Sequence, residues 1–259
     1  MKRLMYQVCL GEAAQSKLYE FCISSVKEYC KIHGIDHYLQ KQPRLRIAPD
    51  PFMSNRSNDS HKKHGGYLPI YEKENAFDMR EQYDQIAIVD ADIFIRPKSP
   101  NIFDDFNSTW GGVVEREMPL NNEYFNKIIN YSKMQYATLN DVDWKWNDKG
   151  AEFINMGLIM FDCNKIDPYM RNQSAREFLN RYEFKRFVDG QGAWKWSTDQ
   201  TLLNWWLKKE EIDVQHMDWT WNGLFSANEK ITECNFVHFF LKDKLPLRGE
   251  KIDELMMRI

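Results

Sequence analysis

Two aspartates separated by one residue, Asp90 and Asp92, follow an apolar run at 86–89 and precede another at 93–95. This pattern predicts a buried strand with both carboxylates at its carboxyl end, pointing to the same face. Carboxylates about 5–6 Å apart would repel by about 3 kcal/mol at an effective dielectric constant near 20. A divalent cation removes this repulsion, and oxygen ligands suit Mg²⁺ or Mn²⁺. We therefore expect Asp90 and Asp92 to bind such a cation, which would hold phosphate groups.

The same spacing occurs a second time, at Asp141 and Asp143. Polar residues surround this copy, and no apolar run leads into it. We interpret it as a solvated loop, because the strand context is what favours a metal role for the first copy.

The composition limits the classes of fold and function to which this chain can belong. The 259 residues are 43% hydrophobic and 14% aromatic, which suffices for a core. A net charge of −3 argues against a dedicated nucleic-acid binder. No segment reaches the 18 apolar residues of a transmembrane helix. The five cysteines are scattered and odd in number, which favours reduced thiols and a cytoplasmic location.

Hydrophobic periodicity predicts alternating strands and helices. A strand at 4–10, a helix at 18–32 ended by Gly34, and a strand at 35–39 form a β-α-β unit and imply a parallel sheet. A long loop at 43–66 follows, and such loops tend to be mobile or functional. Further helices are expected at 69–82, 121–135, 174–182 and 198–208, and further strands at 110–115, 153–161 and 237–241. No composition break marks a second domain.

Three later segments carry polar groups in apolar surroundings. Asn155 and Gly157 interrupt a strand, where a glycine often marks close approach of a ligand. Asp199 and Gln200 open a helix, although an aspartate there is usually a cap. His238 lies on an apolar strand and is followed by two lysines. A single histidine of this kind is more often a core residue than a ligand, so each segment alone is a weak signal.

In this order the four segments resemble the GT-A glycosyltransferases, especially the glycogenin-like and bacterial galactosyltransferase-like (family 8-type) members, over residues 4–245. The resemblance implies an α/β GT-A (Rossmann-like) fold with a mixed, mostly parallel sheet flanked by helices. It also implies one catalytic domain over residues 1–259, with a nucleotide-binding half at about 1–115 and an acceptor-binding half at about 116–259.

Carried over by position, the resemblance implies a role for each motif residue. Asp90, Asp92 and His238 would bind Mn²⁺ or Mg²⁺. The other implied contacts are Leu10 and Gly11 with the nucleoside, Lys73 and Lys242 or Lys244 with the diphosphate, Asn155 and Gly157 with the donor sugar, and Asp199 and Gln200 with the reacting sugar. One departure is that the family's glycine between the late histidine and lysine is absent here.

The implied activity is metal-dependent transfer of a hexose from a nucleotide-diphosphate sugar, with a UDP-sugar favoured, to a hydroxyl of a glycan or other acceptor. Metal and lysines would stabilise the charge that develops on the leaving diphosphate. Asp199 could serve either stereochemical outcome, and the family likeness favours retention over inversion.

Other functions would explain fewer of these motif residues. A haloacid-dehalogenase-type phosphatase also uses two aspartates after a strand, with the first as nucleophile, but Ile93-Phe94 replaces its usual small residue and Thr or Val. A nucleotidyltransferase would need a glycine-rich loop, where only Gly11 stands. A sugar-binding module would explain the paired tryptophans, whose indoles could stack on sugars or pack in the core, but not the carboxylates.

Overall fold

The computed structural model describes residues 1–240, Leu245 and residues 251–259. Its strands are β1 (Arg3–Val8), β2 (Asp36–Gln40), β3 (Gln85–Val89), β4 (Ile93–Ile95), β5 (Trp110–Val114), β6 (Ile154–Asp162), β7 (Val214–His216), β8 (Gly223–Leu224) and β9 (Phe236–His238). Its α-helices are α1 (Lys17–His33), α2 (Asn58–His61), α3 (Asn122–Tyr136), α4 (Cys163–Met170), α5 (Ala175–Leu179), α6 (Lys185–Val188), α7 (Asp199–Lys209) and α8 (Ile252–Met256). Short 3-10 helices span Gly11–Gln15, Lys62–His64, Pro69–Met79, Glu115–Glu117, Tyr182–Phe184, Gly192–Trp196, Trp219–Trp221 and Ile231–Glu233.

The first three elements form the predicted parallel β-α-β unit. β1 pairs with β2 in parallel, from Leu4 opposite Asp36 to Val8 opposite Gln40. Helix α1 ends at Gly34, whose φ of 66° is left-handed, and whose N–H donates to the carbonyl of Cys30. A glycine adopts this conformation without the steric penalty that a side chain would bring.

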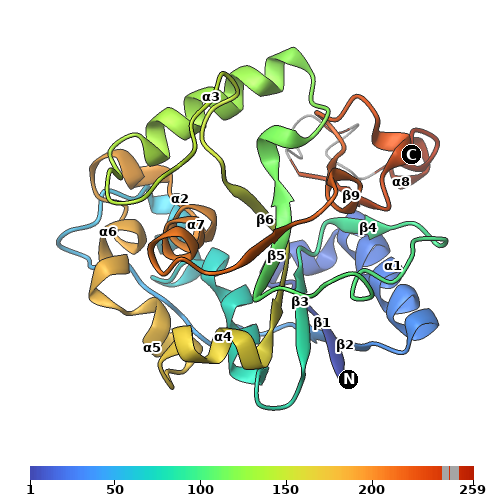
Figure 1. Cartoon of the computed structure of the whole chain (residues 1–259), viewed down its shortest axis with the longest axis horizontal. Coiled ribbons are helices and arrows are strands. Elements are labelled where there is room, and N and C mark those ends of the chain that lie inside the picture. Colours follow the sequence, from blue (N-terminus) through green and yellow to red (C-terminus); the bar gives the residue numbers. More distant parts are fainter. Residues whose placement is uncertain (241–244, 246–250) are drawn as a thin grey trace.

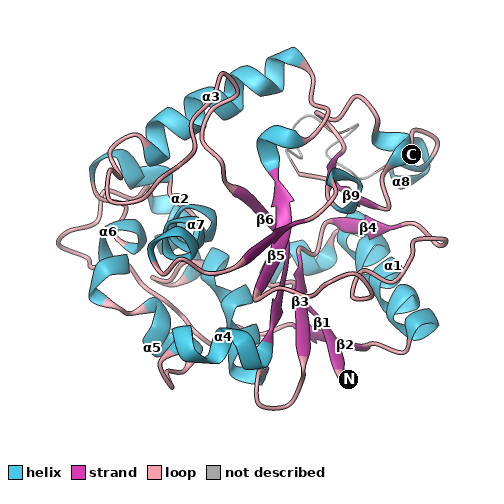
Figure 2. Cartoon of the chain, in the orientation of Figure 1, coloured by secondary structure: helices cyan, strands magenta, loops and turns pink. Residues whose placement is uncertain are grey.

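A six-stranded sheet with the order β2-β1-β3-β6-β5-β7 runs through the middle of the molecule (Figure 1). Three of its five pairings are parallel, while β6 is antiparallel to both β3 and β5. A second, three-stranded sheet has the order β4-β9-β8. Figure 2 shows helices on both sides of the strands, with α1 on one side and α4 to α7 on the other. This is the mixed, helix-flanked α/β architecture that the sequence predicted.

Alternate residues of the central strands pack into different hydrophobic clusters. Leu4 and Tyr6 of β1 belong to the cluster that includes α7, whereas Met5 belongs to the cluster that includes α1. Ile86 and Ala87 of β3 divide in the same way. The strands are therefore buried on both faces, as expected for a sheet covered by helices on each side.

The buried strand predicted before Asp90 and Asp92 is β3, but the two aspartates do not alternate along it. β3 ends at Val89 and β4 begins at Ile93, and the two strands belong to different sheets. Between them the N–H of Ile93 donates to the carbonyl of Asp90 (3.1 Å), which closes a turn. Both flanks are apolar because both strands are buried, so the pattern gave no sign of the turn.

Smaller differences concern helix types and bounds. The helix expected at 69–82 is a 3-10 helix, Pro69–Met79, and the helix expected at 174–182 ends at Leu179. α4 and β7 were not predicted.

The long loop at 43–66 is anchored by Arg56, whose guanidinium donates to the carbonyls of Phe187, Val188 and Ser197. Within the described residues, no helix combines the length and apolarity needed to cross a membrane.

Candidate functional site

Asp90, Asp92 and His238 converge in space. The two aspartates lie on the turn between β3 and β4, and His238 ends β9, which pairs with β4 so that Ile93 is opposite His238. His238 Nε2 lies 3.3 Å from Asp92 Oδ1 and 3.8 Å from Asp90 Oδ2. One ligand atom from each residue lies within 4.8 Å of the others. The turn and the β4-β9 pairing, rather than alternation along one strand, bring the three side chains together.

The imidazole of His238 is oriented for metal binding. Its Nδ1 lies 3.1 Å from Asn222 Oδ1, so Nε2 is the nitrogen that faces the aspartates. A Cβ on Gly157 would lie 2.4 Å from His238 Cε1, so the ring occupies space that only glycine leaves free. Two carboxylates with one neutral imidazole suit Mn²⁺ better than Mg²⁺, because imidazole is a softer ligand than oxygen. The three side chains therefore fit a divalent cation.

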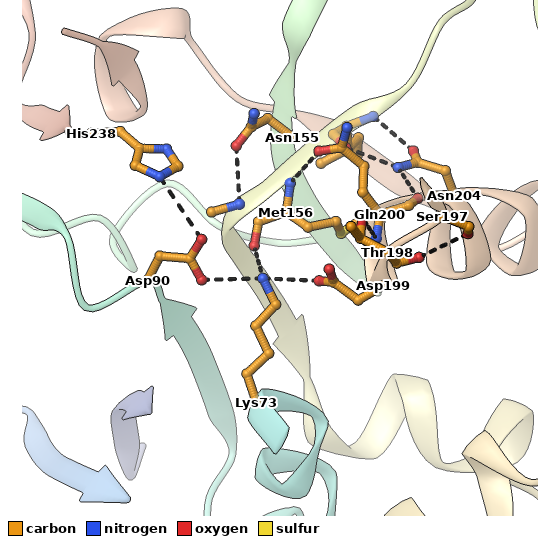
Figure 3. Close-up of polar contacts among 12 residues, drawn as sticks. Lys73, Asp90, Asn155, Met156, Ser197, Thr198, Asp199, Gln200, Asn204 and His238 are labelled. Atoms are coloured by element: carbon orange, nitrogen blue, oxygen red, sulfur yellow. Dashed lines mark hydrogen bonds and ion pairs between the residues drawn. The ribbon is translucent and has the colours of Figure 1, made fainter. Parts of the chain in front are cut away.

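Lys73 links Asp90, a member of the candidate metal cluster formed by Asp90, Asp92 and His238, to the start of α7. Its Nζ lies 3.1 Å from Asp90 Oδ1, 2.8 Å from Asp199 Oδ2 and 2.7 Å from the carbonyl oxygen of Met156 (Figure 3). The three protons of the ammonium match these three oxygens. Burial lowers the pKa of Lys73, but the two carboxylates outweigh it and hold the pKa above its ordinary value. Lys73 is therefore charged and bridges two acids across the site.

Asp199 and Gln200 form the first turn of α7. Thr198 caps the helix, its hydroxyl accepting the N–H of Gln200. Gln200 Oε1 accepts the N–H of Met156 at 3.2 Å, which ties the helix to β6. Burial raises the pKa of Asp199, while the ammonium of Lys73 opposes the shift. The carboxylate and amide predicted to act together do lie together, next to Lys73.

Asn155 is engaged by protein groups on both ends of its amide. Its Nδ2 donates to Glu115 Oε2 at 2.8 Å, and its Oδ1 accepts the N–H of Gly157 at 3.0 Å and Asn222 Nδ2 at 2.9 Å. Glu115 also accepts from the hydroxyl of Tyr124, and burial raises its pKa. Neither Glu115 nor Asn222 was singled out from the sequence, since no local pattern surrounds either residue.

The motif residues line one cavity of about 540 Å³. Its walls include the candidate metal cluster, Lys73, the Asn155–Gly157 segment, Asp199 and Gln200, and one face of α3 that carries Tyr124, Lys127, Ile128 and Tyr131.

A second cavity of about 300 Å³ shares Ile70, Lys73 and Asp90 with the first and is lined by Leu10. Gly11 is exposed and is not among the described lining residues of either cavity. Lys242 and Lys244 lie outside the described residues.

The remaining sequence candidates lie away from this cavity. Asp143 is exposed in a loop, as predicted, although Asp141 and Asp143 line a separate cavity of about 650 Å³ that lacks the metal cluster. Trp144 is buried and stacks on Tyr136, and Trp205 and Trp206 are buried in α7 as predicted. No tryptophan is among the described residues that line the 540 Å³ cavity.

Comparisons with known proteins place the chain by its structure. No protein-family model and no curated protein matches it. An active-site mutant of LgtC superposes with a TM-score of 0.50 at 13% identity, covering 98% of this chain and 95% of that one. Mouse xyloside xylosyltransferase 1 also superposes with a TM-score of 0.50, at 10% identity, covering 95% and 100%. The chain therefore has the GT-A fold, as the sequence resemblance implied.

Proposed function

We propose that this protein is a metal-dependent glycosyltransferase that moves a sugar from a nucleotide-diphosphate sugar, with a UDP-sugar favoured, to a hydroxyl of a glycan or similar acceptor. The observation that carries the proposal is the convergence of Asp90, Asp92 and His238 at a cavity that also holds Lys73 and Asp199. The two similar structures support it. One is named as a xylosyltransferase, and the other is an active-site mutant of LgtC, which is named as a galactosyltransferase. The phosphatase alternative is not favoured, since the fold is GT-A.

The shape of the site suggests where the donor binds. Asp90 and Lys73 line both cavities, so a diphosphate beside Asp90 would extend its nucleoside toward Leu10 and its sugar toward Gly157 and Gln200. Mn²⁺, when bound, would supply positive charge against the leaving diphosphate oxygen. The ammonium of Lys73 already contacts Asp90, Asp199 and the carbonyl oxygen of Met156, so its role is to hold these groups in place beside the donor.

The ion pair of Asp199 bears on the stereochemistry. An inverting enzyme needs a free carboxylate base aimed at the acceptor hydroxyl. Asp199 is 2% exposed and its Oδ2 contacts Lys73, so its charge is neutralised by the enzyme itself. We therefore propose retention of configuration, with Asp199 and Gln200 on the wall that faces the donor sugar.

The test is hydrolysis of a panel of nucleotide-sugars with and without Mn²⁺. We expect Mn²⁺-dependent turnover by the wild type and a loss of about 100-fold or more in Asp92→Asn. The substitution removes a ligand of the cation whose positive charge would stabilise the leaving diphosphate. Asp143→Asn is the matched control, because it makes the same change in the exposed second Asp-x-Asp segment. Equal turnover by folded Asp92→Asn and wild type would refute the site. Phosphatase activity on p-nitrophenyl phosphate, abolished by Asp90→Asn, would refute the function.

A further inference from the structure

A chain of buried polar side chains leads from the interior to the metal-facing histidine. It runs from Glu115 through Asn155 and Asn222 to His238, with contacts of 2.8, 2.9 and 3.1 Å. The exposed fractions of these residues are 4%, 7%, 0% and 5%, so all four are almost fully removed from solvent. Their hydrogen bonds therefore have few competitors, and the direction of each bond matters.

A backbone group fixes the direction of the whole chain. The N–H of Gly157 can only donate, so the atom of Asn155 that it contacts at 3.0 Å must be the carbonyl oxygen Oδ1. This oxygen can only accept, so the atom of Asn222 that faces it must be the amide Nδ2. Asn222 then presents its own Oδ1 to His238, and that oxygen requires a proton on Nδ1. The assignment follows from the backbone and not from a choice of amide orientation.

We infer that Asn222 is a positioning residue that keeps the proton of His238 on Nδ1, so that the lone pair of Nε2 faces Asp90 and Asp92. This inference rests on the proposed metal-dependent function, and it adds a residue that contacts His238 without offering a ligand atom to the cation. The partner of the non-ligating ring nitrogen fixes the tautomer and ring orientation of metal-binding histidines. Gly157 contributes twice, because its N–H sets the polarity and its missing side chain leaves room for the ring.

The first test is the tautomer of His238 in the metal-free wild type. Nitrogen-15 NMR distinguishes a protonated from an unprotonated ring nitrogen. We expect Nδ1 to be protonated and Nε2 to be unprotonated. A proton on Nε2 would overturn the inference. This measurement needs neither a variant nor any substrate.

The second test compares two substitutions of Asn222 by the binding of Mn²⁺ alone, followed by electron paramagnetic resonance. Asn222→Leu removes the acceptor, and we expect Mn²⁺ affinity to fall by about 10- to 100-fold. Asn222→Asp keeps an oxygen for Nδ1–H but loses the amide that donates to Asn155, so we expect its affinity to fall less than that of Asn222→Leu. Equal losses in both folded variants would show a merely structural role and overturn the inference.

The two tests separate this inference from the proposed function. Both are made without a nucleotide-sugar, so an absence of glycosyl transfer would leave their outcomes unchanged. If neither variant folds, the wild-type tautomer decides alone. Conversely, a correct tautomer together with no sugar transfer would refute the function and leave the role of Asn222 intact.

Discussion

Glu74, Glu115 and Asp199 are three buried carboxyl groups with different hydrogen-bond and ion-pair partners. Burial raises the pKa of Glu74, Glu115 and Asp199. Glu115 accepts two hydrogen bonds and Asp199 has the ion pair with Lys73. Glu74 is fully buried, and among the described residues neither of its carboxyl oxygens has a hydrogen-bond partner. Glu74 is therefore the carboxyl group whose charge is least compensated.

The raised pKa of Glu74 predicts a pH-dependent free energy of unfolding. Above the ordinary value of 4.5 the folded state keeps a proton that the unfolded state loses, so stability falls as pH rises toward the folded-state pKa. Glu74→Gln removes this titration. We expect its free energy of unfolding, relative to the wild type, to be greater at pH 8 than at pH 5, by about 1.4 kcal/mol for each pH unit over which the folded wild type keeps the proton. Urea unfolding at both values measures it, with the exposed Glu81→Gln as the control for charge. An equal difference at pH 5 and pH 8 would contradict the prediction.

Some residues of the site could be predicted from the sequence and others could not. Asp90, Asp92 and His238 were found because each lies beside an apolar run and because their order matches a known pattern. Asn222 has no such signal, since its partners His238 and Asn155 are 16 and 67 residues away. A short 3-10 helix precedes it and a two-residue strand follows it. Only the tertiary pairing of β8 and β9 shows its role.

At the scale of elements, helix α7 is hydrogen-bonded to the start of β6, next to the Asn155–Gly157 segment. Asn204 Oδ1 accepts the N–H of Ile154 at 2.7 Å, and its Nδ2 donates to the carbonyl of the same residue at 2.8 Å. A side-chain amide thus takes the place of a neighbouring strand. The helix that presents Asp199 is therefore fixed to the strand that presents Asn155.

This contact predicts the effect of Asn204→Ala. The substitution leaves two buried backbone groups of Ile154 without partners, and each such group costs about 1–3 kcal/mol. We expect the free energy of unfolding to fall by about 2–4 kcal/mol in urea titrations. Asn164→Ala, at an exposed position of α4, is the control for asparagine loss in a helix. Similar small losses in the two variants would show that water replaces the Asn204 amide.

The elements themselves were predictable to different degrees. The β1-α1-β2 unit followed from an apolar run at its start, apolar residues at helical spacing and a glycine stop. The break between β3 and β4 did not, because a turn inside an apolar stretch depends on which sheet each half joins. β7 has three residues and is partly exposed, so it lacks a hydrophobic pattern long enough to detect.

At the scale of the whole molecule, the candidate metal cluster joins the two sheets. Asp90 follows a strand of the large sheet, and His238 belongs to the small one, so a cation bound by both would connect them. The metal-free protein holds two carboxylates near each other, and of these Asp90 is paired with Lys73. A cation that binds only the folded state adds its binding free energy to stability. The thermal stability of the protein should therefore depend on Mn²⁺.

We expect Mn²⁺ at about 100 times its dissociation constant to stabilise the fold by about 2.7 kcal/mol. For a domain of this size the melting temperature should rise by about 5–10 °C, and chelation by EDTA should reverse the rise. Differential scanning calorimetry measures both. Asp92→Asn should lose most of the increase, because it removes a ligand, whereas Asp143→Asn should retain it, because that carboxylate lies in an exposed loop. An equal increase in Asp92→Asn and wild type would mean that Mn²⁺ binds elsewhere, and the link between the sheets would then have to come from protein contacts alone.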